Sequence, residues 1–232
     1  MSNGVGDTLL RIFALAGPLF AVLLVVLFWG MGFLPPLAPT LSAEALVDHY
    51  AQHRTGIRLG ATAIMQLCML GLLWTVAIGE VLERAGRPAL RQLAAAQRLL
   101  GVVTYVVLIF PCIIWTVAAF RPERDPQLLL LLNDLGWLGI VMPILSAVLQ
   151  ALVIGVAVLL DDRPRPAYPR WAGYLNFWCA LLFLPGALAT FFKTGPFAWN
   201  GLFDFWLPVV AFVLWICVVG ALTARAVGRA GG

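Results

Sequence analysis

Two aspartates occupy strongly apolar surroundings. Asp204 lies between Phe203 and Phe205, and Asp134 follows Asn133 after a leucine run. An ionisable group at the centre of a membrane span costs on the order of 2.5 to 3.5 kcal/mol, so such groups normally face the protein interior and serve a function. A carboxyl group in that setting can donate a proton or bind a cation. Asp204 and Asp134 are therefore the candidate catalytic residues, with Asp204 the deeper of the two.

A structural role is the alternative for both aspartates. Each falls at the predicted start of a helix, where the helix dipole and the free N–H groups favour a negative charge by roughly 0.3 to 1 kcal/mol. The cations nearest to them in the predicted topology are Lys193, Arg121 and Arg124. Helix capping therefore competes with proton donation or cation binding as the explanation of these carboxylates.

Amides, indoles and a lysine accompany the two aspartates and favour one binding pocket. Residues 193–201 form a Gly-Pro turn that carries Lys193 and Trp199, and such a segment would cover a pocket as a short lid. A plain connector anchored by Trp199 is the alternative. The predicted ligand-binding residues are Asn133, Asp134, Trp137, Lys193, Trp199, Asn200, Asp204 and Trp206.

His49 and His53 are separated by one helical turn, the spacing that two metal ligands use on one helix face. No glutamate follows His49, so the H-E-x-x-H pattern of metalloproteases is absent. A third ligand would have to come from Glu44, Asp48 or another loop. A solvated polar face of an interfacial helix, or a pH sensor, explains the pair more simply. No metal site and no cofactor are predicted, and His49 and His53 remain only weak metal candidates.

The elements that must position these residues are helices in a membrane. A span needs about 20 apolar residues, and continuous rather than alternating apolar runs exclude barrel strands. Residues 1–232 are 62% hydrophobic and 11% charged, far from a soluble composition, and short connections predict a single all-α, polytopic transmembrane domain. The six predicted spans are residues 12–33, 59–79, 99–120, 135–160, 172–192 and 201–224.

Prolines interrupt the spans and predict irregular helices. From Gln127 to Leu160 one straight helix would measure about 51 Å, so we expect a break near residues 133–136. Proline removes a helical hydrogen bond and kinks the chain. Three of them, Pro143, Pro185 and Pro208, fall in the predicted outer half of the last three spans and would open an outward-facing cavity between helices three to six. Purely architectural kinks are the alternative.

The distribution of arginine favours both termini in the cytoplasm. With that topology ten of the 15 basic residues lie in cytoplasmic segments, and an excess of basic residues in short cytoplasmic loops is typical. The five outside are Arg54, Arg58, Arg121, Arg124 and Lys193. Indoles favour the membrane interface. Those predicted at the outer interface are Trp29, Trp115, Trp137, Trp199 and Trp206, with Trp171 at the inner one.

Polar side chains within the spans, and the charge of the loops, limit the partners. The formal charge of +4 is spread over loops without a basic helix, which argues against nucleic acid. Membrane lipids are the expected surroundings. Five polar residues inside spans are predicted to form hydrogen bonds between helices: Gln66, Thr104, Tyr105, Gln150 and Asn176.

Three segments together resemble a group of uncharacterised bacterial six-helix integral membrane proteins. They are RPERD at 121–125, NDLGW at 133–137 and KTGPFAWNG at 193–201. The resemblance covers nearly the whole chain and implies a bacterial inner (plasma) membrane, but it implies no activity and no site residues.

Three functions fit these observations. The first is a non-catalytic membrane protein that binds or passes a lipophilic or amphipathic small molecule. The second is a membrane-embedded enzyme that acts on a lipid or isoprenoid, with Asp204 or Asp134 as proton donor. The third is an accessory subunit that docks onto a membrane protein partner, or a homo-oligomer.

Overall fold

The computed structural model describes residues 2–121 and 123–230, and all regular structure in these residues is helical. Six helical segments are long and apolar enough to cross a membrane. This confirms the prediction of an all-helical protein with six helices of membrane-spanning length. The elements are α1 (Ser2–Gly30), α2 (Ala43–Glu83), α3 (Pro88–Phe120), α4 (Pro126–Val141), α5 (Leu145–Leu160), α6 (Arg170–Phe183), η1 (Leu184–Phe191), η2 (Leu202–Trp206) and α7 (Leu207–Ala230).

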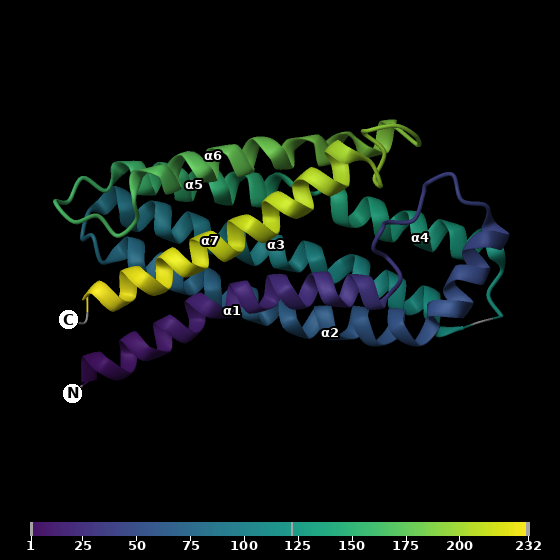
Figure 1. The fold of residues 1–232 in the computed structure, drawn as a ribbon, viewed down its shortest axis with the longest axis horizontal. Helices are drawn as coiled ribbons and strands as arrows, with labels where there is room; N and C mark the ends of the chain where they lie inside the picture. Colours follow the sequence, from purple (N-terminus) through teal and green to yellow (C-terminus); the bar gives the residue numbers. More distant parts are fainter. Residues whose placement is uncertain (1, 122, 231–232) are drawn as a thin grey trace.

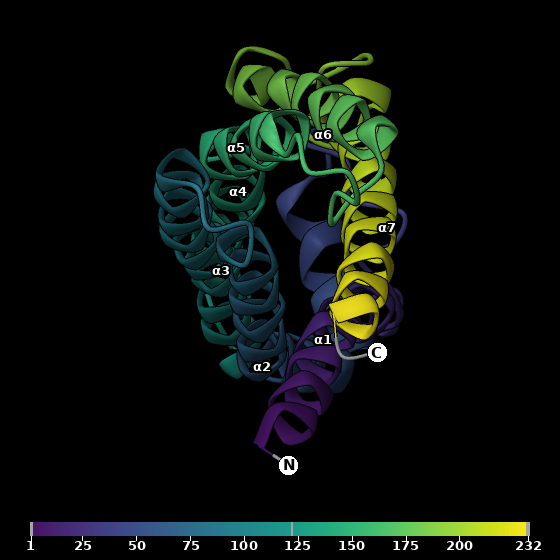
Figure 2. The same cartoon turned by 90° about the vertical axis from the view of Figure 1, so that its left-hand side faces the viewer.

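The spans pack as a closed ring (Figure 2). Along the chain, α1 contacts α2, α2 contacts α3, α3 contacts α5, α5 contacts α6 and α6 contacts α7, and α7 returns to α1. Small residues allow the closing contact, because a Cβ on Gly220 would lie 2.7 Å from the Pro18 ring. Helix α2 also contacts α4 and α7, and no pair of helices separates from the rest as a second domain.

The two ends of the bundle differ in which segments they carry (Figure 1). We call the end at which α1 begins and α7 finishes the terminal end; it also carries the turn between α2 and α3 and the loop from α5 to α6. The opposite end, which we call the far end, carries residues 31–42, the start of α4 and the loop from η1 to η2. Helix α2, with 41 residues, runs from one end to the other.

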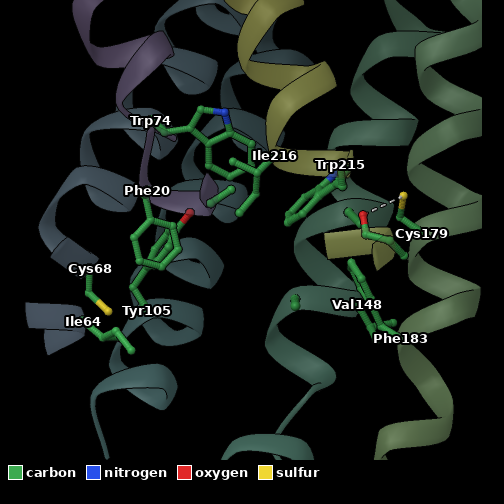
Figure 3. Packing of buried hydrophobic residues seen from close by; sticks show 14 of the residues in the cluster. Phe20, Ile64, Cys68, Trp74, Tyr105, Val148, Cys179, Phe183, Trp215 and Ile216 are labelled. Atoms are coloured by element: carbon green, nitrogen blue, oxygen red, sulfur yellow. Dashed lines mark hydrogen bonds between the residues drawn. The ribbon is translucent and has the colours of Figure 1, made fainter. Parts of the chain in front are cut away.

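Buried aromatic side chains, among them Trp74, Trp215 and Tyr105, fill the middle of the bundle (Figure 3). The rings of Trp74 and Trp215 meet edge to face at 5.2 Å. A Cβ added to Gly17 would lie 2.4 Å from the Trp74 ring, so a larger residue there would displace the indole. Protein interiors are packed as densely as organic crystals, so the absence of a side chain at Gly17 provides the space that the Trp74 ring of α2 occupies.

The fourth span is broken, but not where the sequence suggested. Helix α4 continues through residues 133–136 and stops at Val141, and three turn residues around Pro143 precede α5. Proline lacks the N–H needed to continue the ladder, which places the break there. Gly136 serves a different purpose, since a Cβ on it would lie 2.2 Å from Trp115 Nε1. Its lack of a side chain lets α4 approach α3.

The predicted capping role of Asp134 is wrong for the same reason. Helix α4 begins at Pro126, and its first N–H groups are capped by Asp125, whose carboxylate accepts from Gln127 at 2.9 Å and from Leu128 at 3.2 Å. Asp134 lies in the second half of that helix, far from its N-terminus. The segment of His49 and His53 is also not a separate interfacial helix, because it is continuous with the second span in α2.

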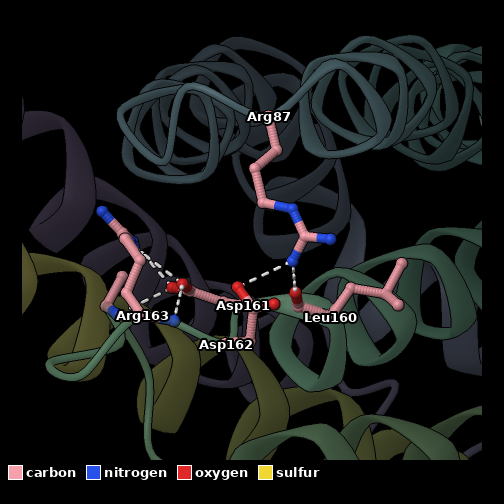
Figure 4. A network of polar contacts seen from close by, with 6 residues as sticks. Arg87, Leu160, Asp161, Asp162 and Arg163 are labelled. Atoms are coloured by element: carbon pink, nitrogen blue, oxygen red, sulfur yellow. Dashed lines mark hydrogen bonds and ion pairs between the residues drawn. The ribbon is translucent and has the colours of Figure 1, made fainter.

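A network of charged groups fastens the terminal end (Figure 4). Arg87 donates to the Leu160 carbonyl at 2.6 Å and pairs with Asp162 at 2.8 Å, so the start of α3 is tied to the end of α5. Asp161 accepts two hydrogen bonds of 2.7 Å from Arg163 and one of 3.0 Å from the Ala167 N–H, which closes the loop between α5 and α6.

Further ion pairs at the terminal end join helices that are distant in sequence. Arg84 pairs with Asp7 at 2.7 Å, and Arg98 pairs with Glu80 and Glu83. These contacts link α1, α2 and α3 at the level where the helices leave the apolar part of the bundle.

Candidate functional site

The three prolines predicted to disturb the last three spans coincide with departures from α-helical geometry. Pro143 lies in the break between α4 and α5, Pro185 lies in the first turn of the 3-10 helix η1, and Pro208 follows the π-helical turn η2. Pro208 has no N–H to donate to the Asp204 carbonyl. In the preceding turn the N–H groups of Trp206 and Leu207 donate to the carbonyls of Gly201 and Leu202, five residues earlier, which is the π-helical pattern. π-helical turns of this kind occur often at functional sites.

These irregular segments border a partly open cavity of about 120 Å³. Apart from one aspartate, Thr104 and Ser146, the walls are apolar. By element, the lining residues are Leu24, Val25 and Phe28 of α1; Leu34; Thr104, Val107 and Leu108 of α3; Ile140, Val141, Pro143, Ile144, Ser146 and Ala147 around the α4–α5 break; Phe183 and Gly186; and Asp204, Phe205, Pro208, Val209, Phe212 and Val213.

Asp204 is the charged residue of this cavity. Its side chain is buried, with 2% of the residue exposed, and neither carboxylate oxygen has a hydrogen-bond partner within the described residues. The two other polar side chains satisfy each other, because the hydroxyls of Thr104 and Ser146 lie 3.1 Å apart and Thr104 also donates to the Leu100 carbonyl at 2.9 Å. Asp204 is thus left with unmet hydrogen-bonding capacity inside an apolar space.

The prediction that Asp204 faces the bundle rather than lipid agrees with this position. More segments line the cavity than expected. Residues of the first span and Leu34 form part of its walls, in addition to residues of spans three to six. No local signal in the sequence would have identified Phe28 or Leu34, because one apolar residue in a span resembles the next until the packing is known.

An aromatic cluster stands behind one wall of the cavity. Phe28 and Phe205 line the cavity and both contact Trp137, at ring distances of 6.4 and 6.0 Å. Trp137 in turn meets Trp115 edge to face at 5.3 Å, and Phe33 lies against both indoles. Trp137 therefore supports the residues beside Asp204 and is not itself among the lining residues.

The other residues selected from the sequence occupy several different environments. Asn133 is buried and accepts a hydrogen bond of 3.3 Å from the Tyr50 hydroxyl. Trp199 is buried and donates to the Leu37 carbonyl at 2.7 Å, which fastens residues 193–201 to the loop after α1. Lys193 is exposed and lies near half-buried Asp134. Of the eight selected residues, Asp204 is the one among the lining residues of the described cavity; Asn200 and Trp206 are not.

Three of the five tryptophans assigned to the outer interface are placed differently. Trp115 and Trp137 are fully buried and Trp199 is 5% exposed, and the first two rings pack edge to face between α3 and α4. Trp29 and Trp206, at 71% and 39% exposed, are consistent with an interfacial position. Trp171, expected at the other interface, is exposed at the terminal end.

None of the cations expected to be counter-ions of Asp204 forms an ion pair with it in the described residues. Arg124 donates to the Val117 carbonyl at 3.0 Å, and neither Arg121 nor Lys193 forms an ion pair with Asp204 within the described residues. The carbonyls at the end of α3 are taken by Arg54, which donates to Ala119 and Phe120. Arg54 and Arg124 therefore cap the end of α3.

The two histidines form a pair, as their spacing predicted. Their rings stack at 4.3 Å, and His53 Nδ1 lies 3.1 Å from the His49 carbonyl. They line a second hollow, of about 540 Å³, together with Trp29 and residues of the loop after α1. No cluster of three His, Cys, Asp or Glu side chains suited to a metal occurs in the described residues. Leu34 lines both this hollow and the Asp204 cavity.

Comparison of the chain with protein-family models, with curated proteins and with solved structures found no match. The described residues thus define an all-helical protein with six helices of membrane-spanning length, and an apolar cavity beside three prolines that contains the buried carboxylate of Asp204.

Proposed function

We propose that this protein binds or passes a lipophilic or amphipathic small molecule in the cavity around Asp204. The observation that carries the proposal is the pair of unpartnered carboxylate oxygens in an otherwise apolar space. A buried polar group without a partner is destabilising, so its presence is best explained by a partner that arrives with a ligand.

The chemistry of the walls defines the ligand. The apolar walls favour a hydrocarbon or aromatic body, and the carboxylate favours a group that donates a hydrogen bond or carries a positive charge. A cavity of about 120 Å³ accepts a small molecule or one end of a longer one. A lipophilic amine or alcohol combines these two features.

The binding experiment uses benzylamine, a one-ring amine that is protonated at neutral pH, and counts bound molecules by native mass spectrometry of the purified protein. We expect one molecule bound per chain. Asp204→Asn should weaken binding tenfold or more, about 1.4 kcal/mol, because the amide retains volume but not charge. Val209→Trp, which fills the cavity, should abolish it.

Asp134→Asn is the matched control. It removes the same charge from a half-buried position that does not line the cavity, so its affinity should equal that of the wild type. Equal binding by Val209→Trp would place the probe elsewhere and overturn the proposal.

An enzyme that protonates a lipid or isoprenoid is the second candidate, because an unpartnered carboxyl group among apolar walls also suits a proton donor. The two candidates differ in what happens to the bound molecule. Deuterium from heavy water would be incorporated into an isoprenoid alkene by an enzyme with Asp204, but not by Asp204→Asn. A binding protein would release its ligand unchanged.

The proposed setting is a bacterial inner membrane with the terminal end in the cytoplasm. The excess of arginine at that end supports the orientation. Reporter fusions after Arg98 and Arg229 should be cytoplasmic, and one after Lys193 should be external. An external reporter after Arg229 would reverse the topology.

A further inference from the structure

A second space lies beside the Asp204 cavity at the far end of the bundle. It is the hollow of about 540 Å³ next to the loop after α1, and its walls include Trp29, Pro36 and the two histidines. Leu34 belongs to the walls of this hollow and also to the walls of the Asp204 cavity. The two spaces therefore meet at one aliphatic side chain.

The two spaces differ in size and in the polar groups they offer. The cavity, at about 120 Å³, holds only one end of a longer molecule, whereas the hollow has room for a larger part of it. The cavity contains the unpartnered carboxylate of Asp204, and the hollow contains the imidazole rings of His49 and His53. Each space thus combines apolar walls with polar atoms of its own.

The histidine pair favours a ligand group that donates a hydrogen bond. A backbone carbonyl only accepts, so the 3.1 Å contact between His53 Nδ1 and the His49 carbonyl places the proton of the neutral ring on Nδ1. His53 Nε2 is then an acceptor, and it faces Gly32, where a Cβ would lie 2.7 Å from it. His49 Nε2 is buried and has no hydrogen-bond partner in the described residues. A hydroxyl group suits this pair, because it both donates and accepts.

The loop that carries Leu34 is fixed on both sides of this residue. Phe33, directly before it, is fully buried and donates its N–H to the Phe28 carbonyl at 3.0 Å. The carbonyl of Leu37, shortly after it, accepts the Trp199 indole N–H at 2.7 Å. Leu34 itself is half-buried, and a leucine side chain changes between staggered rotamers without a change of the backbone. A ligand that occupies both spaces therefore requires movement of one side chain rather than of the loop.

We propose that the hollow is the second compartment of the Asp204 binding site, and that the ligand is an elongated amino alcohol. Its amine lies at Asp204, its hydrocarbon chain passes Leu34, and its hydroxyl group lies at the pair formed by His49 and His53. This inference rests on the proposed function and adds to it the length of the ligand and a second polar group.

Linear amino alcohols of four to twelve carbon atoms test the proposal, each compared with the alkylamine of the same length. Native mass spectrometry of the purified protein gives the number of bound molecules and their affinity. In the short members the hydroxyl group should add nothing, because it does not reach the histidines. Once the chain spans both compartments, the hydroxyl group should strengthen binding tenfold or more, with one molecule bound per chain.

Three variants assign this gain to particular residues. His53→Phe keeps an aromatic ring and removes both ring nitrogens, so it should abolish the gain from the hydroxyl group and leave the binding of benzylamine and of the alkylamines unchanged. Asp204→Asn should weaken amino alcohols and alkylamines alike. Gln52→Leu, which removes an exposed polar side chain next to His53 but outside the hollow, is the matched control and should behave as the wild type.

Three results would overturn the second compartment. The first is a hydroxyl group that brings no gain at any chain length, and the second is a gain that persists in His53→Phe. The third is a long amino alcohol that still binds Asp204→Asn with the affinity of the wild type, because the hollow would then be a separate site. Failure of the proposed function is seen independently, as benzylamine binding that does not depend on Asp204.

Discussion

Asp161 and Asp204 are both buried aspartates, yet the two halves of the bundle treat them in opposite ways. At the terminal end, Asp161 accepts hydrogen bonds from Arg163 and from a backbone N–H. In the half toward the far end, Asp204 has no partner within the described residues and faces apolar walls. The first carboxylate stabilises a loop, whereas the second destabilises the empty protein.

The backbones of the two halves differ in the same sense. Helices near the terminal end are regular and joined by ion pairs between α1, α2, α3 and α5. Toward the far end three spans lose α-helical geometry, and large aromatic rings fill the room this creates. The irregular helical segments and the unpartnered carboxylate of Asp204 therefore occur in the same half of the bundle, a combination that is typical of functional sites.

The largest effect is expected from the aromatic cluster of the irregular half. Trp137→Ala should lower the free energy of unfolding by about 3 to 5 kcal/mol, because it leaves a large void among packed rings. Trp206→Ala, which removes a partly exposed indole from the same region, should cost far less. Chemical denaturation in detergent compares the two, and similar losses would contradict the assignment of Trp137 to the interior.

The next effect has the opposite sign. Asp204→Leu should stabilise the ligand-free protein by about 1 to 3 kcal/mol, because a well-packed apolar side chain replaces an unpartnered carboxylate. Asp204→Asn should change stability less, since the amide is also unsatisfied. A loss of thermal stability in the leucine variant would show that Asp204 has a structural partner.

Substitution of Asp161 should destabilise the protein, and the size of this effect should depend on pH. Burial raises the pKa of Asp161, but the hydrogen bonds from Arg163 and from the Ala167 N–H, with the Arg163 charge, outweigh it and hold the pKa below its usual value. The stabilisation is therefore complete above the ordinary aspartate pKa of about 3.9 and is lost as pH falls through the lower folded value.

Asp161→Asn should accordingly cost about 1 to 2 kcal/mol at pH 7, and the difference from wild type should shrink below about pH 4. Unfolding temperatures measured from pH 7 to pH 3 test this. Asp162→Asn is the control, because that side chain is 74% exposed and its one ion pair is solvated, so it should cost less. A constant difference at all pH values would contradict the role of the Asp161 charge.

The smallest effect is expected at Arg98. Arg98→Met keeps the aliphatic length and removes the pairs with Glu80 and Glu83, which should cost roughly 0.5 to 1 kcal/mol. High salt should reduce that cost. Arg91→Met, at an exposed position of the same helix, serves as the comparison and should have no measurable effect.

Sequence reasoning was sufficient for the parts of this molecule governed by local composition. Apolar runs of spanning length predicted six helices, and three prolines predicted where helices would become irregular. The break in the fourth span was expected near residues 133–136, too early in the chain, because the length of the apolar run shows that a break is needed but does not locate it. In the structure Gly136 receives the Trp115 ring and Asn133 receives the Tyr50 hydroxyl.

The residues of the candidate site also differ in whether the sequence could identify them. Asp204 was identifiable because a charge among phenylalanines is conspicuous along the chain. The walls around it were not, since Phe28 and Leu34 come from the first span and its loop and meet Asp204 only when the ring closes. Tryptophans were assigned to the interface by their type, and only tertiary packing distinguishes buried Trp137 from exposed Trp29.

The contact between α1 and α7 that closes the ring has a consequence for biosynthesis. Helix α7 and the preceding turn are translated last, yet they supply Asp204 and five other residues of the cavity, while α1 waits from the beginning of synthesis for its second neighbour. Until α7 has been synthesised, the face of α1 that packs against it has no neighbour within the chain. The cavity is therefore complete only after the last helix has packed against the first.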